Sequence, residues 1–266
     1  MSNEKCMKTD ITPFLPRLKK VQEIRPLVHC ITNTTTIWDC ANLLLAAGAS
    51  PTMAHHPQEV AEITAGCRAL VCNLGAMDDF EAMLAAAPVA AKLGHPIVVD
   101  PVGCGGSSFR RQRFRRLAEA APITCVRGNA SEIRALAMDT ATVTGVDAGE
   151  EESAQGLEEV KLRAMQLAAE YGCLVIASGA TDILTDGRQI VEVTAGDPMM
   201  ARITGSGCMS TALLGAFLAA DNSLESALAA CTIMGCCGET AAERARREGR
   251  GSMTFHTYLI DEMSLL

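Results

Sequence analysis

Residues 96–103, PIVVDPVG, join an apolar run without alternation to an aspartate and a glycine-containing loop. A strand buried on both faces has this pattern, because helices cover both sides of a parallel sheet. We therefore expect a buried strand here that leads to Asp100 and then to a loop. In open parallel α/β sheets, ligands bind outside the carboxyl ends of the strands, so functional residues are expected near Asp100.

Similar apolar runs lie on either side, separated by Ala- and Leu-rich stretches with helical spacing. The expected strands span 27–32, 50–54, 69–75, 123–128 and 174–179. The expected helices span 35–48, 57–66, 78–93, 107–120, 152–171, 207–221, 223–247 and 253–265, with a further one starting after 129. ILTDG and QIVEV are split by Asp186-Gly187, which is typical of a hairpin. This order predicts one α/β domain over residues 1–266. Its central sheet is mostly parallel with helices on both faces and an antiparallel hairpin near one edge, and residues 139–152 form a flexible insert.

Composition excludes several classes of protein. The net charge is −8 and no long basic stripe occurs, so nucleic acid is not expected as a partner. The opening segment is polar and no apolar run approaches about 20 residues, which predicts a cytoplasmic protein without a membrane span. The twelve cysteines lack zinc-ligand spacing, and about ten of them are expected as buried, reduced thiols. A thiol-based metal or redox sensor would need paired cysteines, and only Cys236 and Cys237 are adjacent.

A glycine-rich segment, RITGSGCMS, leads into one of the Ala-rich helices. Gly205 and Gly207 flank Ser206 and allow backbone conformations that turn several N–H groups inward. The helix N-terminus adds a partial positive charge, so these residues predict an anion hole for a phosphate in transfer. An ordinary turn at a helix start has the same sequence features. The chain contains no GxxxxGK[ST] phosphate loop.

Four ionisable side chains lie at the predicted strand ends or helix starts. The first turn of a helix would lower the pKa of Cys208 and make it a usable base, although a small buried residue also fits this position. Asp100 suits Mg²⁺ binding through water, or capping of its turn. Glu132 either completes that metal site or interacts with the N-terminus of its helix. Arg127 ends a buried strand and needs an anion, which is a nucleotide phosphate or one of these two carboxylates.

Five blocks, PLVHCITN, GASPTMAHHPQE, DPVGCGGSS, VRGNASEI and TGSGCMSTAL, together resemble the signature of hydroxyethylthiazole kinases in the ribokinase-like superfamily. The resemblance extends from about Arg25 to Leu218. Most sugar and pyrimidine kinases of that superfamily have Asp where this chain has Cys208. The resemblance implies a ribokinase-like kinase domain that phosphorylates 4-methyl-5-(2-hydroxyethyl)thiazole with ATP and Mg²⁺ in thiamine salvage. The alternative is another ribokinase-like kinase, acting on a small alcohol or on hydroxymethylpyrimidine.

The resemblance also implies catalytic and metal-binding roles. Cys208 takes the position of the general base beside the substrate hydroxyl, and the amides of residues 205–208 form the hole for the transferred phosphoryl group. Asp100 and Glu132 match the carboxylates that contact Mg²⁺ and phosphate. Cys104 and Gly105 stand where a small residue and a glycine are usual.

Nucleotide and substrate contacts follow from the same blocks. Arg127 and Ser178 match the family's ATP-contacting residues, with Ser178 in place of the usual Thr. Met53 and Gly205 match the thiazole-contacting positions, and Asn33 matches the residue that orients the substrate. Enzymes of this family are trimers with the thiazole pocket at the subunit interface. Met53 is therefore expected to contribute to a pocket wall across that interface.

Overall fold

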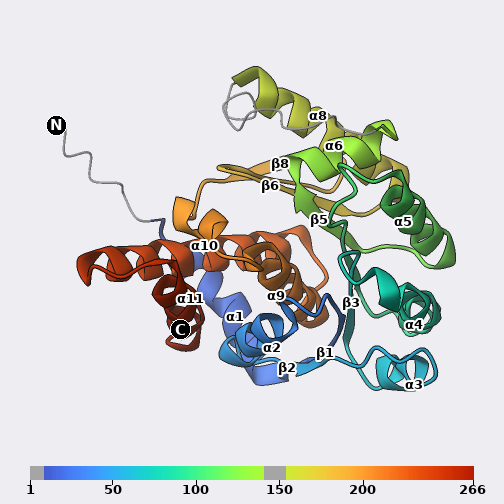
Figure 1. Ribbon diagram of the computed structural model, residues 1–266, viewed down its shortest axis with the longest axis horizontal. Helices are drawn as coiled ribbons and strands as arrows, with labels where there is room; N and C mark the ends of the chain where they lie inside the picture. The colour runs from blue at the N-terminus through green and yellow to red at the C-terminus, as the bar shows by residue number, and fades with distance from the viewer. Residues whose placement is uncertain (1–8, 141–153) are drawn as a thin grey trace.

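The computed structural model describes residues 9–140 and 154–266. Within these ranges, eight strands form one sheet in the order β2-β1-β3-β4-β5-β6-β7-β8 (Figure 1). Strands β1 to β6 pair in parallel, whereas β7 is antiparallel to both β6 and β8. The expected mostly parallel sheet with a hairpin at one edge is confirmed. The strands are β1 Leu27–Ile31, β2 Ser50–Thr52, β3 Ala69–Asn73, β4 Ile97–Asp100, β5 Cys125–Asn129, β6 Leu174–Ser178, β7 Asp182–Thr185 and β8 Ile190–Val193.

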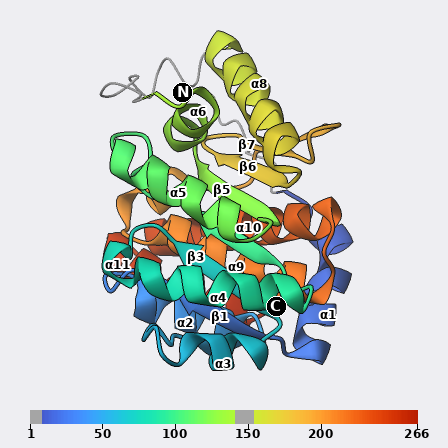
Figure 2. The same cartoon turned by 90° about the vertical axis from the view of Figure 1, so that its right-hand side faces the viewer.

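Helices cover both faces of the sheet, with α4 and α5 on the near side in Figure 2 and α9 and α10 behind. The central strands contribute to both hydrophobic cores: in β4, Val98 belongs to the core with α9 and α10, whereas Ile97 and Val99 belong to the core with α4 and α5. This two-sided burial is the reason for the unalternating apolar runs. The helices are α1 Leu15–Ile24, α2 Ile37–Ala46, α3 Val60–Ala65, α4 Phe80–Lys92, α5 Ser108–Ala120, α6 Ala130–Met138, α8 Ala154–Tyr171, α9 Ser206–Ala220, α10 Leu224–Arg247 and α11 Ser252–Ser264.

The helix α9 lies directly on the sheet because one of its residues is a glycine. A Cβ at Gly215 would lie 2.6 Å from Cγ2 of Val71 on β3 and 3.1 Å from Cγ1 of Val28 on β1. Only a residue without a side chain fits at this distance. The close packing holds the first turn of α9 at the carboxyl ends of β1, β3 and β4.

Several boundaries differ from the sequence prediction, and α1 was not predicted. Only Leu18 and Val21 are buried in α1, so its periodic apolar signal is weak. The strand expected over 96–103 ends at Asp100, because a turn follows in which Gly103 adopts φ +78°. Residues 57–59 precede α3 as a turn.

The insert expected over 139–152 lies outside the described residues except for its first two positions. Ten of the cysteines in the described ranges are buried free thiols, as expected, and Cys208 is partly exposed. No helix in the same ranges combines the length and apolar character needed to cross a membrane.

Candidate active site

The residues predicted to form an anion hole lie at the start of α9. Gly205 is the N-cap residue with φ +92°, a backbone conformation that favours glycine. A Cβ at Gly205 would lie 2.7 Å from Cγ2 of Thr36, so no side chain fits there. The helix begins at Ser206, and the backbone N–H groups of its first turn have no acceptors within the helix. This turn therefore presents N–H groups and the positive end of the α9 dipole.

Arg127 on β5 reaches this turn. Its Nη1 donates a hydrogen bond of 3.1 Å to the carbonyl oxygen of Gly207. A Cβ at Gly207 would lie 2.9 Å from the same Nη1, so the glycine makes this approach possible. The charge of Arg127 also lowers the pKa of Asp100 and of Glu132, and so favours their ionised forms. The sequence analysis expected an anionic partner for Arg127. Asp100 and Glu132 are close enough for its charge to lower their pKa values, although neither makes a direct ion pair with it among the described contacts.

Cys208 lies among amide side chains from two strand ends. Its Sγ is 3.1 Å from Nδ2 of Asn73, the last residue of β3, and 3.5 Å from Nδ2 of Asn33, which follows β1. Burial and the nearby Asp100 raise the pKa of the Cys208 thiol, and hydrogen bonds from Thr36, Asn73 and Asn33 offset this only in part. The sequence prediction of a lowered pKa for Cys208 is therefore wrong, because burial of the thiol and the nearby carboxylate raise it.

Asp100 ends β4 and is only 3% exposed. Its Oδ2 accepts hydrogen bonds from Nδ2 of Asn73 at 3.1 Å and from Oγ1 of Thr211 at 2.9 Å. The pKa of Asp100 is raised to about 7, chiefly by burial. The charge of Arg127 and the Thr211 hydrogen bond lower this pKa, whereas the charge of Glu132 contributes to the rise. The register of the sheet explains the contact with Asn73, since β3 and β4 pair Asn73 with Asp100.

Glu132 forms a capping box at the start of α6. Its Oε2 accepts from the N–H of Asn129 at 2.9 Å, and the Asn129 side chain accepts from the Glu132 N–H in return. Its Oε1 accepts from the N–H of Gly103 at 2.8 Å, which ties α6 to the loop after β4. Burial raises the pKa of Glu132, although these two backbone donors lower it. The interaction of Glu132 with its helix N-terminus is confirmed.

The donor set fits a magnesium ion that is shared with phosphate. Across residues 9–140 and 154–266, no three His, Cys, Asp or Glu side chains gather into a group able to hold a metal by themselves. Mg²⁺ commonly uses one or two carboxylates and completes its shell with water and substrate phosphate. The charge of Glu132 raises the pKa of Asp100, so a cation beside these carboxylates is favoured.

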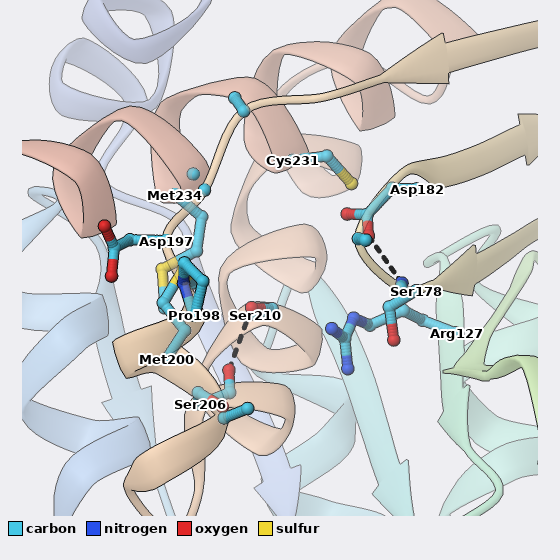
Figure 3. A pocket seen from close by; sticks show the side chains of 16 residues that line it. Arg127, Ser178, Asp182, Asp197, Pro198, Met200, Ser206, Ser210, Cys231 and Met234 are labelled. Carbon is cyan, nitrogen blue, oxygen red and sulfur yellow. Dashed lines mark hydrogen bonds between the residues drawn. The ribbon is translucent and has the colours of Figure 1, made fainter. Parts of the chain in front are cut away.

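A cavity of about 550 Å³ opens beside Arg127 and the first turn of α9. Figure 3 shows Arg127, Ser178 and Asp182 on one side of it and Asp197, Pro198 and Met200 on the other. Ser178 at the end of β6 donates through Oγ to the carbonyl oxygen of Gly128 at 3.2 Å. Burial raises the pKa of Asp182, the carboxyl that faces this cavity from β7. The lining residues are Arg127, Ser178, Gly179, Ala180, Asp182, Ala195, Gly196, Asp197, Pro198, Met200, Ala201, Ser206, Ser210, Cys231, Met234 and Gly235.

The structure thus places the predicted site residues in two adjoining groups and leaves one apart. Asn33 and Asp100 surround Cys208, while Arg127, Ser178 and Ser206 line the cavity. Met53 follows β2 at the edge of the sheet, is partly buried, and is not among the lining residues.

Three residues of the site were missed by sequence reasoning. Asn73 contacts both Cys208 and Asp100, Thr211 contacts Asp100, and Asp182 faces the cavity. Asn73 carried a usable signal, because it is the polar residue that ends the apolar run ALVCN in a predicted parallel strand. Thr211 gave no such signal, since it lies inside an apolar helix.

Comparison with known proteins first defines the class. The fold matches a ribokinase-like superfamily protein from Enterococcus faecalis with a TM-score of 0.58 at 11% identity, over 93% of this chain and 95% of that chain. The chain thus has the ribokinase-like fold, a mostly parallel sheet with helices on both faces and an antiparallel edge.

Residues 18–266 match the Hydroxyethylthiazole kinase family. A hydroxyethylthiazole kinase from Methanocorpusculum labreanum is 44% identical over 234 residues, which cover 87% of each chain. The structure of a hydroxyethylthiazole kinase protein from Pyrococcus horikoshii matches with a TM-score of 0.84 at 37% identity, over 96% of this chain and 94% of that chain. The chain belongs to the hydroxyethylthiazole kinase family.

Proposed function

We propose that this protein transfers the γ-phosphoryl group of ATP to the hydroxyl of 4-methyl-5-(2-hydroxyethyl)thiazole, a step of thiamine salvage. One observation carries the proposal. The amide-lined start of α9, residues 205–208, opens beside Arg127 at the 550 Å³ cavity and has a thiol, Cys208, in its first turn. An anion site, a cation that faces phosphate and a polar group for the acceptor hydroxyl thus occur together.

The cavity suits a nucleotide bound with its phosphates toward α9. Arg127, Ser178 and Ser206 supply polar groups at one end, where the triphosphate binds. Pro198, Met200 and neighbouring residues supply an apolar wall for the base. The proposed ATP-binding roles of Arg127 and Ser178 rest on this arrangement.

In the proposed reaction, the hydroxyl oxygen of the thiazole forms a bond to the γ-phosphorus. The bond between that phosphorus and the β,γ-bridging oxygen breaks, and ADP leaves with the electron pair. The amides of residues 205–208 and the guanidinium of Arg127 stabilise the charge on the transferred group. Asp100 and Glu132 are the residues that would hold Mg²⁺ together with the phosphates, and the bound ion would supply neutralisation of phosphate charge.

Cys208 acts on the acceptor hydroxyl. Its raised pKa keeps it a thiol in the resting enzyme, with its position fixed by the amide groups of Asn33 and Asn73. Phosphoryl transfer has a loose transition state, so the hydroxyl proton is lost late and needs little help from a strong base. We propose that the Cys208 thiol first releases its proton to water once ATP is bound. The thiolate then orients the hydroxyl and receives its proton as the new P–O bond forms, while Asn33 orients the substrate.

We further propose that the thiazole lies between Gly205 and Met53, in a pocket completed by a second subunit of a homotrimer. Met53 is partly buried at the sheet edge, and a thioether packs well against a sulfur-containing ring. The use of ATP agrees with a cytoplasmic enzyme.

The proposal is tested by ADP release from the purified protein with ATP and Mg²⁺. Hydroxyethylthiazole is compared with hydroxymethylpyrimidine and a panel of sugars, and the product is checked by mass for one added phosphoryl group. Among these acceptors, we expect rapid turnover only with the thiazole. Faster turnover with hydroxymethylpyrimidine or a sugar would show that the thiazole is not the preferred substrate. If no acceptor were turned over, the kinase assignment would be overturned.

A further inference from the structure

One wall of the cavity is a chain segment that belongs to neither the sheet nor a long helix. Residues 194–202, here called the wall segment, connect β8 to the glycine-rich turn before α9 and contain the short 3-10 helix Pro198–Arg202. Six of them line the cavity: Ala195, Gly196, Asp197, Pro198, Met200 and Ala201. Only Met199 is buried within the segment, so apolar burial alone holds it weakly.

The wall segment lies against α10 through two glycines of that helix. A Cβ at Gly235 would lie 2.5 Å from the carbonyl oxygen of Ala195, and one at Gly238 would lie 2.5 Å from Sδ of Met200. The backbone of the segment therefore follows the surface of α10 closely. Its distance from Arg127, on the opposite side of the cavity in Figure 3, is set by this contact.

Two charged side chains of α10 hold the segment in place. Oε1 of Glu239 accepts a hydrogen bond of 3.0 Å from the N–H of Gly196. Arg246, two turns further along α10, donates to both oxygens of Asp197 at 2.7 Å each. Asp197 also accepts from the N–H of Met199 at 2.9 Å and so caps the 3-10 helix. Its side chain is 12% exposed, whereas that of Arg246 is 57% exposed.

We propose that Arg246 and Glu239 are positioning residues for the nucleotide, because they fix the wall segment at the spacing that the bound base requires. The inference rests on the proposed use of ATP in this cavity. Neither residue lines the cavity, so both act through Asp197 and Gly196. A bidentate arginine–carboxylate pair fixes orientation as well as distance, which a single contact cannot do.

Loss of these ties has a distinct kinetic signature. The groups that surround the reacting atoms, Cys208 and Asp100, lie on other elements and keep their contacts. Loosening of the wall therefore weakens ATP binding and leaves the chemical step and thiazole binding unchanged. A residue that served only global stability would lower the unfolding midpoint without this selective effect on ATP.

The test compares Arg246→Ala, Arg246→Lys and Glu239→Ala with the wild-type enzyme in the presence of Mg²⁺. We expect Arg246→Ala to raise both the KM and the calorimetric Kd for ATP about threefold to tenfold, as for a well-oriented but partly exposed ion pair. Glu239→Ala should act in the same direction, and Arg246→Lys should recover part of the loss. The kcat and the KM for the thiazole should change by less than about twofold. Arg247→Ala is the matched control, since this neighbouring arginine is 71% exposed and only approaches Glu248 at 3.9 Å.

The outcomes separate the two proposals. If the wild-type protein binds and turns over ATP but Arg246→Ala leaves both ATP constants unchanged, the positioning role is wrong and the kinase assignment stands. It is also wrong if Arg246→Ala lowers kcat as much as it weakens ATP binding. If the wild-type protein neither binds nor hydrolyses ATP, the proposed function fails instead. Should Arg246→Ala not fold, the ATP constants of Arg246→Lys and Glu239→Ala decide.

Discussion

The buried carboxylate of Asp100 should make the metal-free protein less stable as the pH rises. Burial raises its pKa from 3.8 to about 7, so the folded state holds the proton more tightly than the unfolded chain does. The stabilisation by that proton is fully present below pH 3.8 and is lost as the pH rises through 7. At about 1.4 kcal/mol per pKa unit, the complete loss is roughly 4 kcal/mol, of which roughly 2 to 3 kcal/mol falls between pH 5 and pH 8.

Asp100→Asn removes this ionisation and keeps the shape of the side chain. The amide oxygen of the variant can still accept the hydrogen bonds from Asn73 and Thr211. We therefore expect the variant to be more stable than the wild type at pH 8, and its advantage to shrink by roughly 2 to 3 kcal/mol at pH 5. The same variant should lose kinase activity, because the proposed Mg²⁺ carboxylate is gone.

The assay is urea unfolding of both proteins at pH 5 and pH 8 with a chelator present, so that no cation neutralises the carboxylate. Asp186→Asn is a control of opposite sign, because backbone N–H groups of Gln189 and Arg188 lower the pKa of that exposed carboxyl. Removal of the negative charge of Asp186 should therefore not stabilise the protein at pH 8. The reasoning is refuted if the difference in free energy of unfolding between Asp100→Asn and the wild type does not widen from pH 5 to pH 8. In that case, ionisation of the buried carboxylate does not destabilise the fold.

Three further predictions concern α9. Cys208→Ala should lower kcat roughly 10²–10⁴-fold with little change in ATP affinity, whereas Cys208→Asp should retain or raise turnover in the ADP-release assay. Gly207→Ala should raise the KM for ATP roughly tenfold or more, because its Cβ would lie 2.9 Å from Nη1 of Arg127 and would displace the guanidinium. Gly215→Ala should reduce the free energy of unfolding by roughly 1–3 kcal/mol, measured in urea, because its Cβ would lie 2.6 Å from Cγ2 of Val71.

Each of these predictions has a clear contrary result. Full activity of Cys208→Ala would remove the thiol from the mechanism. Gly251→Ala is the control for added side-chain volume, since nothing lies within 4 Å of its Cβ position. An unchanged ATP KM in Gly207→Ala would show that Arg127 does not contact phosphate. Unchanged stability of Gly215→Ala would show that α9 can move away from the sheet at little cost.

The layout of the sheet and the region of the site could be predicted from local patterns. Apolar runs such as IVV before Asp100 report burial on both faces, and the carboxyl ends of parallel strands lie on one edge of a sheet. The glycines before α9 likewise indicated a backbone conformation that other residues rarely adopt, and Gly205 has φ +92°. These features depend on residues that are neighbours in the chain, so the sequence carries them directly.

Contacts between distant segments were decided by the tertiary structure. The pairing of β3 with β4 brings Asn73 to Asp100, and close packing on α10 sets the position of the wall segment. The pKa of Cys208 is the clearest case, because its local position at a helix start predicts a lowered value and its surroundings raise it. Burial and charge at a site depend on which elements pack together, and spacing along the chain does not encode this.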